Sequence, residues 1–553
     1  MKWLLLISAA FMLPAQARPI YRLTDLSVLG APAPSGIETQ SPRQSLPIGP
    51  DHTCPAVDSK SGPPVSLQGI FSDSGALIVQ KSEQMGQQRV NFIPGKQLTP
   101  QASAIAPEDI GTLGGTWSVL AGANKNDWIA GTSETAGGVA RAFIWRNGQM
   151  IDLGTLGGQN SRAVSINDAG VVIGYAEKDS GEFSPFFWKD GKITELFGFS
   201  TVLLLSKEGG LILGCDAQKN FIQSENAQMP LLVSVALPAG VGGIINVQGQ
   251  IVGFTSSFSP YLTDLFGGGW TQDKSFFSQN GQISDVHREL GADFSNIPLI
   301  SEHGHAGGWV GYVNTKFNDL IGPPFVRRPD GSIKIANEFS DFVSAGNALA
   351  INTKGHLTGN LISDYVYGKD KAYLIRGDEA FDLNELIDPK DPLRGCVELW
   401  QGNNINERDQ IIVSGMDCKD WDKSSNWWST TRDYLLTPGE WRATALHPVN
   451  SDGTSVFKKT STVPLKFEAE IFDEKSCSLP RAQLKLEYIA TAQNRRVNEQ
   501  SYILATDSGV DFRVEGCMYS YNLKTNLLPP GNYLAKVVID GEEAGSVRFS
   551  LRQ

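Results

Sequence analysis

The central part of the chain repeats a short motif, and this constrains its fold more than any other feature. The clearest unit opens with Asp-Leu-Gly-Thr-Leu-Gly-Gly at 152–158, continues through Ile-Asn-Asp-Ala-Gly at 166–170, and ends with Pro-Phe-Phe-Trp at 185–188. The preceding unit opens with Asp-Ile-Gly-Thr-Leu-Gly-Gly at 109–115 and ends with Ala-Phe-Ile-Trp at 142–145. Self-similarity at a period of roughly 20 to 50 residues is the sequence signature of repeat architectures.

Two submotifs extend the repeat along the chain, and they alternate strictly. The first is an apolar residue, a polar turn and an apolar strand closed by glycine, and the second is an aromatic-apolar strand followed by a turn. The first occupies 70–79, 123–131, 166–174, 205–214, 245–253, 300–311, 351–359 and 405–415. The second appears at Phe92, Phe143, Phe186, Phe221, Phe276, Phe325, Tyr373 and Tyr434. Because the two independent counts agree, the repeat has about eight units.

Each unit predicts about four short antiparallel strands. The apolar runs are short, β-branched or aromatic, and bounded by glycine, which favours strands over helices. Asn-Gly and Asp-Gly pairs at 147–148, 190–191 and 280–281 accept the positive φ of tight hairpin turns. A single sheet of this kind cannot bury both faces, and packing sheets radially solves that problem. The sequence therefore predicts an all-β fold with a single 7- or 8-bladed β-propeller over residues 18–447.

These residues resemble the HAF repeat of exported bacterial proteins. The shared signature is D-[LI]-G-T-L-G-G, then I-N-x-x-G-x-V-x-G, then A-F-x-W-x-x-G-x-x-x-D-L. Units within 109–196 match it well, whereas units after 200 keep the strands and lose the Gly-Thr-Leu-Gly-Gly segment. The resemblance covers residues 21–446, and it implies an extracellular propeller-like repeat protein with no established general activity.

The ends of the repeat array leave two arrangements open. Residues 21–26 read as the outermost strand of a unit and would close the ring against the last blade, but residues 441–446 offer a second strand for the same place. Eight blades, or seven blades with irregular ends, both fit. Residues 31–68 are rich in Pro, Ser and Gly, and they predict a long surface-loop insertion that carries Cys54.

The C-terminal segment has a different texture from the repeat. Residues 448–460 are polar and predict a linker, and residues 461–553 show alternating strands at short spacing, typical of an immunoglobulin-like β-sandwich. The sequences V-P-L-K-F, Y-N-L-K-T, P-G-N-Y and S-V-R-F-S-L resemble the PxKF domain of secreted bacterial proteins. That resemblance implies a non-catalytic appended module. A fibronectin-like sandwich is the alternative, and it changes nothing functional.

The first 17 residues predict a signal peptide. Lys2 supplies the positive charge, residues 3–13 form an apolar core too short to cross a bilayer as a helix of about 20 residues, and Ala15-Gln16-Ala17 is a cleavage site. We expect the mature chain to begin at Arg18 and to be periplasmic or extracellular. No later stretch predicts a transmembrane segment. The net charge of −12 makes nucleic acid and anionic lipid poor partners.

Six cysteines in an exported chain indicate disulfides. The most economical pairs are Cys477 with Cys517 and Cys396 with Cys418, because the members of each pair lie near each other in the sequence. Cys54 and Cys215 remain as a third pair with weaker support. No pair has the C-x-x-C spacing of a structural zinc site, so we predict no metal.

No catalytic motif and no cofactor motif occurs in the chain. His303 and His305 are two residues apart, and on a strand they would share a face as metal ligands do. They fall at the turn of a repeat unit, which favours a solvated loop. The repeat aromatics are a different case: Phe143, Trp145, Phe186, Phe187 and Trp188 predict core packing.

The best candidate ligand surface is a polar and aromatic segment after the eighth glycine-closed strand. Exposed tryptophans can stack on sugars, and oxygen-rich loops can hold calcium. Yet the sequence D-C-K-D-W-D lacks the order of a known calcium loop. An ordinary loop held by a Cys396–Cys418 disulfide is the simpler interpretation. The residues concerned are Asp417, Asp420, Trp421, Asp422, Trp427 and Trp428.

Two functions from different classes fit this sequence. The first is an exported, non-catalytic repeat protein that binds a macromolecule or a glycan, and the second is a secreted hydrolase with its active site on one propeller face. Propellers host both, so the fold cannot decide between them. Carboxylates or histidines that converge at the centre would favour the enzyme, and a groove of aromatic and amide groups would favour binding. The absence of a catalytic motif favours the binding protein.

Overall fold

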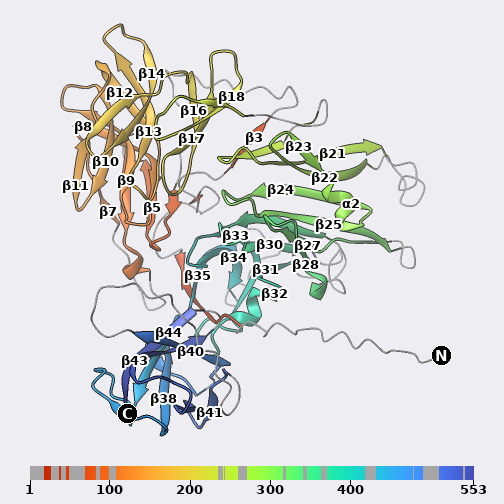
Figure 1. Ribbon diagram of the computed structural model, residues 1–553. Coiled ribbons are helices and arrows are strands. Elements are labelled where there is room, and N and C mark those ends of the chain that lie inside the picture. The colour runs from red at the N-terminus through yellow and green to blue at the C-terminus, as the bar shows by residue number, and fades with distance from the viewer. Residues whose placement is uncertain are drawn as a thin grey trace. The chain divides into compact units, whose positions relative to one another are not determined.

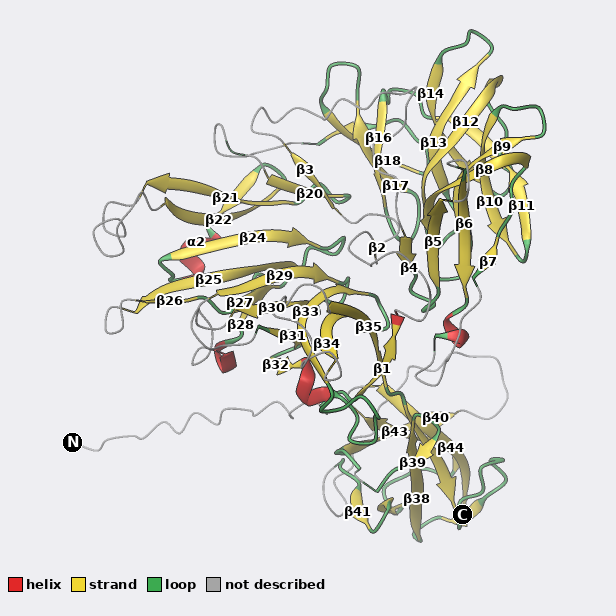
Figure 2. Ribbon diagram, turned by 180° about the vertical axis from the view of Figure 1, so that it is seen from behind, coloured by secondary structure: helices red, strands yellow, loops and turns green. Residues whose placement is uncertain are grey.

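The computed structural model shows an all-β protein in which almost every regular element is a strand (Figures 1 and 2). It divides into two compact units. The larger is Tyr21–Thr437, and the smaller is Pro438–Gln553 together with the residues before Tyr21. The structure describes residues 18–26, 37–38, 45–48, 69–82, 87–98, 107–233, 241, 243–258, 271–314, 319–339, 345–362, 370–417, 431–477, 479–489, 510–539 and 542–553.

The described residues of the larger unit form eight small sheets that follow one another along the chain, and we number them in that order. Four strands make the core of each sheet; in the first seven sheets these strands follow chain order and neighbouring strands are antiparallel. The first sheet has β4 (Gly69–Phe71), β5 (Leu77–Ser82), β6 (Gln88–Ile93) and β7 (Glu108–Asp109). The second has β8 (Gly114–Ala123), β9 (Ile129–Thr135), β10 (Ala140–Arg146) and β11 (Gln149–Asp152). The third has β12 (Gly157–Ile166), β13 (Val172–Lys178), β14 (Phe183–Lys189) and β15 (Lys192–Glu195).

The middle sheets continue this pattern. The fourth sheet has β16 (Thr201–Leu205), β17 (Leu211–Cys215), β18 (Phe221–Glu225) and β19 (Leu231–Leu232). The fifth has β20 (Gly243–Asn246), β21 (Ile251–Phe258), β22 (Thr271–Gln279) and β23 (Gln282–Ser284), and the short helix α2 (Val286–Leu290) follows it. The sixth has β24 (Phe294–Ile300), β25 (Ala306–Asn314), β27 (Pro324–Arg327) and β28 (Ile333–Ile335), with β26 (Asp319–Ile321) paired to β25.

The last two sheets complete the series. The seventh has β29 (Ala345–Ile351), β30 (Leu357–Ile362), β31 (Lys371–Arg376) and β32 (Glu379–Asp382). The eighth has β33 (Val397–Ile405), β34 (Ile411–Asp417) and β35 (Thr431–Pro438), and its fourth strand is β1 (Tyr21–Asp25). The N-terminal strand therefore fills the open place in the last sheet.

Hairpin turns form where the sequence predicts them. Asn147 and Gly148 between β10 and β11 have φ values of 51° and 75°, and Asp190 and Gly191 between β14 and β15 have 50° and 84°. Two successive positive φ values are the requirement of a tight primed turn, which Asn, Asp and Gly meet at low cost. These turns fix the register of the outer hairpin in each of these sheets.

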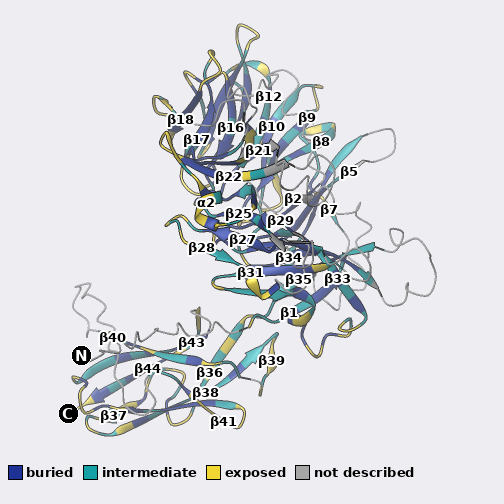
Figure 3. Ribbon diagram, turned by 90° about the vertical axis from the view of Figure 1, so that its right-hand side faces the viewer, coloured by how far each residue is buried: buried dark blue, intermediate teal, exposed yellow. Residues whose placement is uncertain are grey.

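The core of the larger unit consists of apolar clusters that each join neighbouring sheets. Phe143 and Trp145 of the second sheet pack with Ile70 and Val90 of the first, while Trp188 of the third sheet packs with residues of the second. Figure 3 shows many of these strands in the dark blue of buried residues. The prediction that the repeat aromatics are core residues is confirmed. Their exposed fractions are 0% for Phe143, 6% for Trp145, 0% for Phe186, 7% for Phe187 and 4% for Trp188.

The boundary between the units lies earlier than the sequence predicts. The strand β36 (Trp441–Leu446) pairs with β38 (Thr462–Ile471) in the smaller unit, so it is not the outer strand of the last repeat. Residues 448–460 are not a simple linker either. Val449 is buried in the core of the smaller unit, and β37 (Val456–Lys458) pairs with β44 (Glu542–Arg552). The alternating apolar side chains of β36 face that core, which is why the strand belongs there.

The expected surface loop at 31–68 also contains paired strands. Its described parts are β2 (Ile37–Glu38), which pairs with β4 of the first sheet, and β3 (Ser45–Ile48), which pairs with β20 of the fifth. The remainder of the segment, including Cys54, lies outside the described residues. Polar and Pro-rich composition alone did not reveal that short pieces of this segment extend two sheets.

The smaller unit consists of two sheets around one core. One sheet has the order β36, β38, β42 (Met518–Lys524) and β41 (Arg513–Glu515), with β39 (Glu474–Lys475) paired to β38. The other has the order β37, β44, β43 (Gly531–Ile539) and β40 (Ala482–Ile489). A single apolar cluster takes residues from both sheets, among them Phe467, Tyr519, Tyr533 and Phe549. Two sheets that share one buried face make a β-sandwich.

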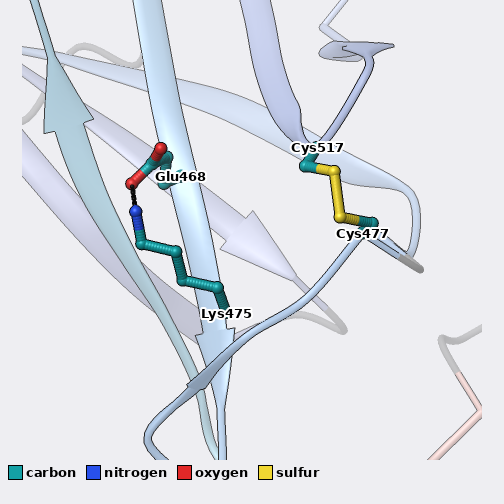
Figure 4. The surroundings of a disulfide bond; sticks show 4 residues. All are labelled: Glu468, Lys475, Cys477 and Cys517. Atoms are coloured by element: carbon teal, nitrogen blue, oxygen red, sulfur yellow. Dashed lines mark hydrogen bonds and ion pairs between the residues drawn. A yellow bond between two sulfur atoms is a disulfide. The ribbon is translucent and has the colours of Figure 1, made fainter.

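A disulfide between Cys477 and Cys517 joins two segments of the smaller unit, as the sequence predicts (Figure 4). The Cα atoms lie 4.2 Å apart, just below the usual range for a disulfide. Glu468 and Lys475 form an ion pair at 2.6 Å nearby. Cys215 and Cys396 are also disulfide-bonded, and their partners lie outside the described residues.

Among the described residues, no helix has both the length and the apolar character needed to cross a membrane.

Candidate functional site

A buried asparagine holds the turn between the first two strands of most sheets. In the third sheet, the Oδ1 atom of Asn167 accepts the backbone N–H groups of Ala169 at 3.1 Å and Val171 at 2.9 Å. Its Nδ2 atom donates to the backbone oxygens of Ser206 at 2.9 Å and Gly209 at 2.8 Å, in the turn of the fourth sheet. One side chain therefore shapes its own turn and fastens it to the next one.

The same contact recurs between other neighbouring sheets. The Nδ2 atom of each asparagine donates to the backbone oxygen of the residue at the equivalent position in the following sheet. Serine takes the asparagine position in the first, fourth and sixth sheets, at Ser72, Ser206 and Ser301. The pairs are Asn124 with Asn167, Asn246 with Ser301, Asn352 with Asn406, and Asn406 with Ser72. The last of these pairs links the eighth sheet to the first.

The residue after the asparagine or serine is charged in six of the eight sheets. In four sheets it is a carboxylate that accepts a backbone N–H group from the corresponding residue of another turn. Because each such bond satisfies a main-chain donor, these carboxylates position backbone as well as charge. The bonds are Lys125 N–H to Asp168 at 2.9 Å, Lys207 N–H to Glu302 at 2.7 Å, Thr353 N–H to Glu407 at 3.0 Å and Glu407 N–H to Asp73 at 3.0 Å.

The side chain of Lys207 connects turns that are far apart in the sequence. Its Nζ atom lies 2.6 Å from Oδ2 of Asp73 and 3.2 Å from Oε1 of Glu407. These three residues come from the fourth, first and eighth sheets, and we call them the Lys207 cluster. Their side chains are 14%, 11% and 17% exposed, so the ion pairs are largely withdrawn from water. A buried charge is tolerated only when it is paired in this way.

The environment shifts the pKa values of the cluster in different directions. Burial raises the pKa of Asp73 above its ordinary value despite the attraction of Lys207. Burial also acts to raise the pKa of Glu407, but the charge of Lys207 and the hydrogen bonds from Thr353 outweigh it and lower that pKa. Burial acts to lower the pKa of Lys207, and the charges of Asp73 and Glu407 reverse the effect, so its pKa is raised. The raised pKa of Lys207 and the lowered pKa of Glu407 favour the charged forms of these two groups, whereas the raised pKa of Asp73 acts in the opposite direction.

A second charged group lies where the turns of the seventh and eighth sheets meet. Nδ1 of His356 lies 2.7 Å from Oδ1 of Asp409, and Asp409 also accepts from Nδ2 of Asn352 at 2.9 Å. Lys354 and Arg376 lie 3.8 Å and 3.9 Å from Oδ2 of Asp409. Burial acts to raise the pKa of Asp409, but His356 and these cations lower it overall. Asp409 is therefore a paired anion that joins the two turns.

The two histidines singled out in the sequence do not converge on one site. His303 is exposed, whereas His305 is half-buried and its ring packs against Gly355 of the seventh sheet. A Cβ atom added to Gly355 would lie 2.4 Å from Cδ2 of His305, so the contact requires glycine. Burial lowers the pKa of His305. The expected solvated loop therefore holds for His303 but not for His305.

The predicted ligand surface after the eighth glycine-closed strand falls almost wholly outside the described residues. Asp417 ends β34, and the rest of the set lies in the part of the chain that the structure leaves undescribed: Asp420, Trp421, Asp422, Trp427 and Trp428. In the described part, no group of three or more His, Cys, Asp or Glu side chains is arranged to hold a metal ion.

The Lys207 cluster and the turn carboxylates are the polar groups that sequence reasoning missed. The signal was available in the repeat itself, because Asp73, Asp168, Glu302 and Glu407 all directly follow the asparagine or serine of the polar turn. Aligning the turns column by column would have shown an acidic position. It would not have shown that Lys207, which occupies the same column, reaches two of these acids.

The comparisons with known proteins identify no family. No protein-family model and no curated protein matches the chain. Among solved structures, the alkylpurine DNA glycosylase AlkC of Pseudomonas fluorescens has a TM-score of 0.13 with 14% identity over 21% of this chain and 31% of that one. The acylaminoacyl peptidase of Pyrococcus horikoshii has a TM-score of 0.29 with 10% identity over 71% and 56%. TolB of Acinetobacter baumannii has 0.20 with 8% identity over 58% and 81%.

This chain thus spans less than two thirds of the length of the first two of these structures. TM-scores of this size do not indicate a shared fold, so the activities of these proteins are not carried over to this chain.

Proposed function

We propose that this chain is an exported, non-catalytic repeat protein that binds a macromolecule or a glycan outside the cytoplasm. The observation that carries this proposal is the Lys207 cluster. Lys207 forms ion pairs with both acids, and the two acids accept backbone N–H groups of neighbouring turns. A general base needs a lone pair directed at substrate, but here the oxygens are engaged in holding turns together. The charged groups of the Lys207 cluster thus stabilise the fold.

The proposed architecture is an eight-bladed β-propeller built from HAF-like repeats. Three contacts support it. β1 supplies the fourth strand of the eighth sheet, Asn406 of the eighth sheet donates to Ser72 of the first, and Lys207 of the fourth sheet reaches acids of the first and eighth. A closed array brings the first and last sheets together and directs equivalent turns toward a common axis. The smaller unit would serve as a PxKF-like spacer or attachment module.

Export is part of the proposal. The signal-peptide pattern of residues 1–17 supports it, and so do the disulfide between Cys477 and Cys517 and the bonded state of Cys215 and Cys396. Disulfides persist mainly in oxidising compartments. The net charge of −12 continues to argue against nucleic acid as the partner.

A secreted hydrolase is the second candidate, and one observation favours it. Asp73 and Glu407 share one cluster, and their pKa values are shifted in opposite directions. When the environment moves the pKa values of two neighbouring carboxyl groups apart, one group can act as the general acid and the other as the general base. The binding proposal differs in its expectation, because it requires Asp73 and Glu407 to support the fold and not to contact substrate.

The test uses the mature chain from Arg18 in two parallel assays. A glycan array and a pull-down from surface and secreted fractions should identify a partner that binds saturably. A panel of glycoside, ester and peptide substrates should show no turnover. Saturable turnover that disappears in a folded Glu407→Gln variant, but survives in the matched exposed variant Glu208→Gln, would overturn the binding proposal in favour of the hydrolase.

A further inference from the structure

In two sheets, the edge formed by the first strand pairs with a further short strand. In the first sheet β2 pairs with β4 at that edge, and in the fifth sheet β3 pairs with β20. In the other six sheets, no further strand among the described residues pairs with the first strand, and in the second and eighth sheets the side chains of Gln80 and Asn384 bond its backbone instead. Both added strands come from the same stretch of chain before the first sheet. An unpaired row of N–H and C=O groups is a template for strand addition.

The pairing of β3 with β20 has the form of peptide recognition by strand addition. The two strands are antiparallel, and the register places Ser45 opposite Asn246, Pro47 opposite Ile244 and Ile48 opposite Gly243. In this mode, main-chain hydrogen bonds supply affinity, and pockets for alternate side chains supply specificity. Among the described side chains of β3, Ser45 is partly buried and Pro47 is exposed.

Ile48 provides the side-chain anchor of this contact. Its exposed fraction is 4%, and it belongs to an apolar cluster with Leu204 and Phe221 of the fourth sheet and Ile245 and Phe276 of the fifth. The anchor site is therefore an aliphatic and aromatic socket at the junction of two sheets. Its lining excludes a charged or polar side chain, because nothing in an apolar cluster would replace the lost hydration.

β3 itself holds this edge through few interactions. It is four residues long, Pro47 has no N–H group to donate, and Ile48 is its one side chain known to be buried. By contrast, β21 on the other side of β20 has eight residues, and Ile251 and Val252 in it are fully buried. β20 is therefore held in the sheet mainly by β21, and residues 45–48 pair with its other edge.

We propose that the β20 edge is a binding site for an extended polypeptide with an aliphatic residue at the Ile48 position, and that Ser45–Ile48 occupies this site in cis. The inference rests on the proposed binding function, and it names the partner as a polypeptide strand and not a glycan. Because the cis segment belongs to the same chain, it competes at a high effective concentration. A partner therefore needs a longer strand, or one without proline, to displace it.

The experiment measures binding of a fluorescent peptide with the sequence of residues 44–49, Gln-Ser-Leu-Pro-Ile-Gly, to the full mature chain. The variant Ile48→Asp should expel the cis segment and bind the peptide at least tenfold more tightly than the unaltered chain. The matched control is Ile283→Asp. Ile283 lies in β23 at the opposite edge of the same sheet, is 48% exposed, and should leave peptide binding at the unaltered level. A peptide with Asp in place of Ile should not bind to any of these chains.

A milder variant separates displacement from unfolding. Ile48→Ala should give an intermediate affinity and unchanged circular dichroism. If Ile48→Asp binds no better than Ile283→Asp, or binds the Asp-containing peptide equally well, the proposal is wrong. If both Ile48 variants lose the fold of the larger unit, the segment is an integral strand and the proposal is likewise overturned.

The outcome also separates this inference from the proposed function. Failure of peptide binding together with a saturable glycan or protein partner in the array and pull-down would refute the strand-addition site alone. Binding of the peptide followed by its cleavage would uphold the site and refute the non-catalytic function.

Discussion

Asn406 in the turn of the eighth sheet donates from Nδ2 to the backbone oxygen of Ser72 in the first sheet, at 3.0 Å and across 334 residues of sequence. The Oδ1 atom of the same side chain accepts the N–H groups of Arg408 and Gln410, each at 3.0 Å. Asn406 is 1% exposed, so water cannot replace these bonds. The residue thus joins the ends of the repeat array and orders its own turn.

Replacing Asn406 with alanine should destabilise the larger unit by about 2–4 kcal/mol, because several buried main-chain groups lose their partner together. Urea unfolding followed by tryptophan fluorescence measures this change. The control is Asn126→Ala, in the equivalent turn of the second sheet, where the side chain is exposed and the change should stay within about 0.5 kcal/mol. Equal effects of the two substitutions would contradict the structural role of Asn406.

Replacing Lys207 with methionine should cost about 3–5 kcal/mol, because it leaves Asp73 and Glu407 buried without their shared cation. Methionine keeps much of the volume and removes the charge. The matched control is Lys125→Met, whose side chain is 48% exposed and whose ion pairs with Asp168 and Glu208 should contribute about 1 kcal/mol or less. The unfolding temperatures of the unaltered chain and the two variants measure these differences. An unchanged unfolding temperature in the Lys207→Met variant would show that the fold does not depend on the cluster.

The opposite pKa shifts of Asp73 and Glu407 predict opposite pH dependences. The raised pKa of Asp73 means that the folded chain binds this proton more tightly than the unfolded chain does. The unaltered chain should therefore gain stability relative to Asp73→Asn as pH falls through the raised pKa toward about 3.9, the value for an unfolded Asp. The lowered pKa of Glu407 gives the reverse sign. Relative to Glu407→Gln, the unaltered chain should lose stability as pH falls below about 4.3.

Urea unfolding of the three chains between neutral pH and the acid range measures both differences. Each variant is the control for the other, since both remove one carboxylate from the same cluster. Two differences of the same sign would contradict the assigned pKa directions.

The sequence predicts the strands of this protein well because each strand is specified locally. The Asn147-Gly148 turn requires two positive φ values, and the Phe143-Ile144-Trp145 run requires burial, and both needs can be read within ten residues. The two matching counts of eight anticipated the number of sheets in the larger unit. Long-range pairing was less accessible. That β1 and not β36 completes the eighth sheet depends on which partner offers the better buried face, and no local pattern encodes this.

The polar contacts escaped prediction for a related reason. Lys207 reads as one more charged turn residue, and only the arrangement of the fourth, first and eighth sheets brings it to Asp73 and Glu407. The sequence predicts a loop at 45–48 because the composition there is typical of loops, whereas the observed strand forms through its pairing with β20 and the apolar cluster around Ile48. Contacts between segments that are far apart in the sequence cannot be predicted from the local sequence of either segment.

The remaining disulfides should join Cys396 to Cys418 and Cys54 to Cys215. Val397 and Asp417 are paired residues of β33 and β34, and Cys396 and Cys418 are their immediate neighbours in the sequence, so we expect the two cysteines to lie within reach of a disulfide. Cys215 belongs to the apolar cluster that contains Ile48, and Cys54 follows Ile48 by six residues, a reach of at most about 20 Å. Mass spectrometry of non-reduced proteolytic peptides identifies the linked pairs, with Cys477–Cys517 as the internal control. A Cys54–Cys418 link would contradict both assignments.

Removal of the disulfide in the smaller unit should destabilise that unit and leave the larger one unchanged. The bond closes a loop with a sequence separation of 40 residues, and in the chain-entropy model such a loop restricts the unfolded chain enough to stabilise the fold by about 4 kcal/mol. The unit has a single core between its two sheets, so no second core compensates for the loss.

We therefore expect the paired substitution of Cys477 and Cys517 by alanine to lower the unfolding temperature of one calorimetric transition in the full mature chain. The transition of the larger unit, identified by its shift in the Asn406→Ala variant, should keep its temperature. A paired substitution that shifts neither transition would show that the sandwich core is sufficient without the bond, whereas a shift of both would mean that the two units unfold together.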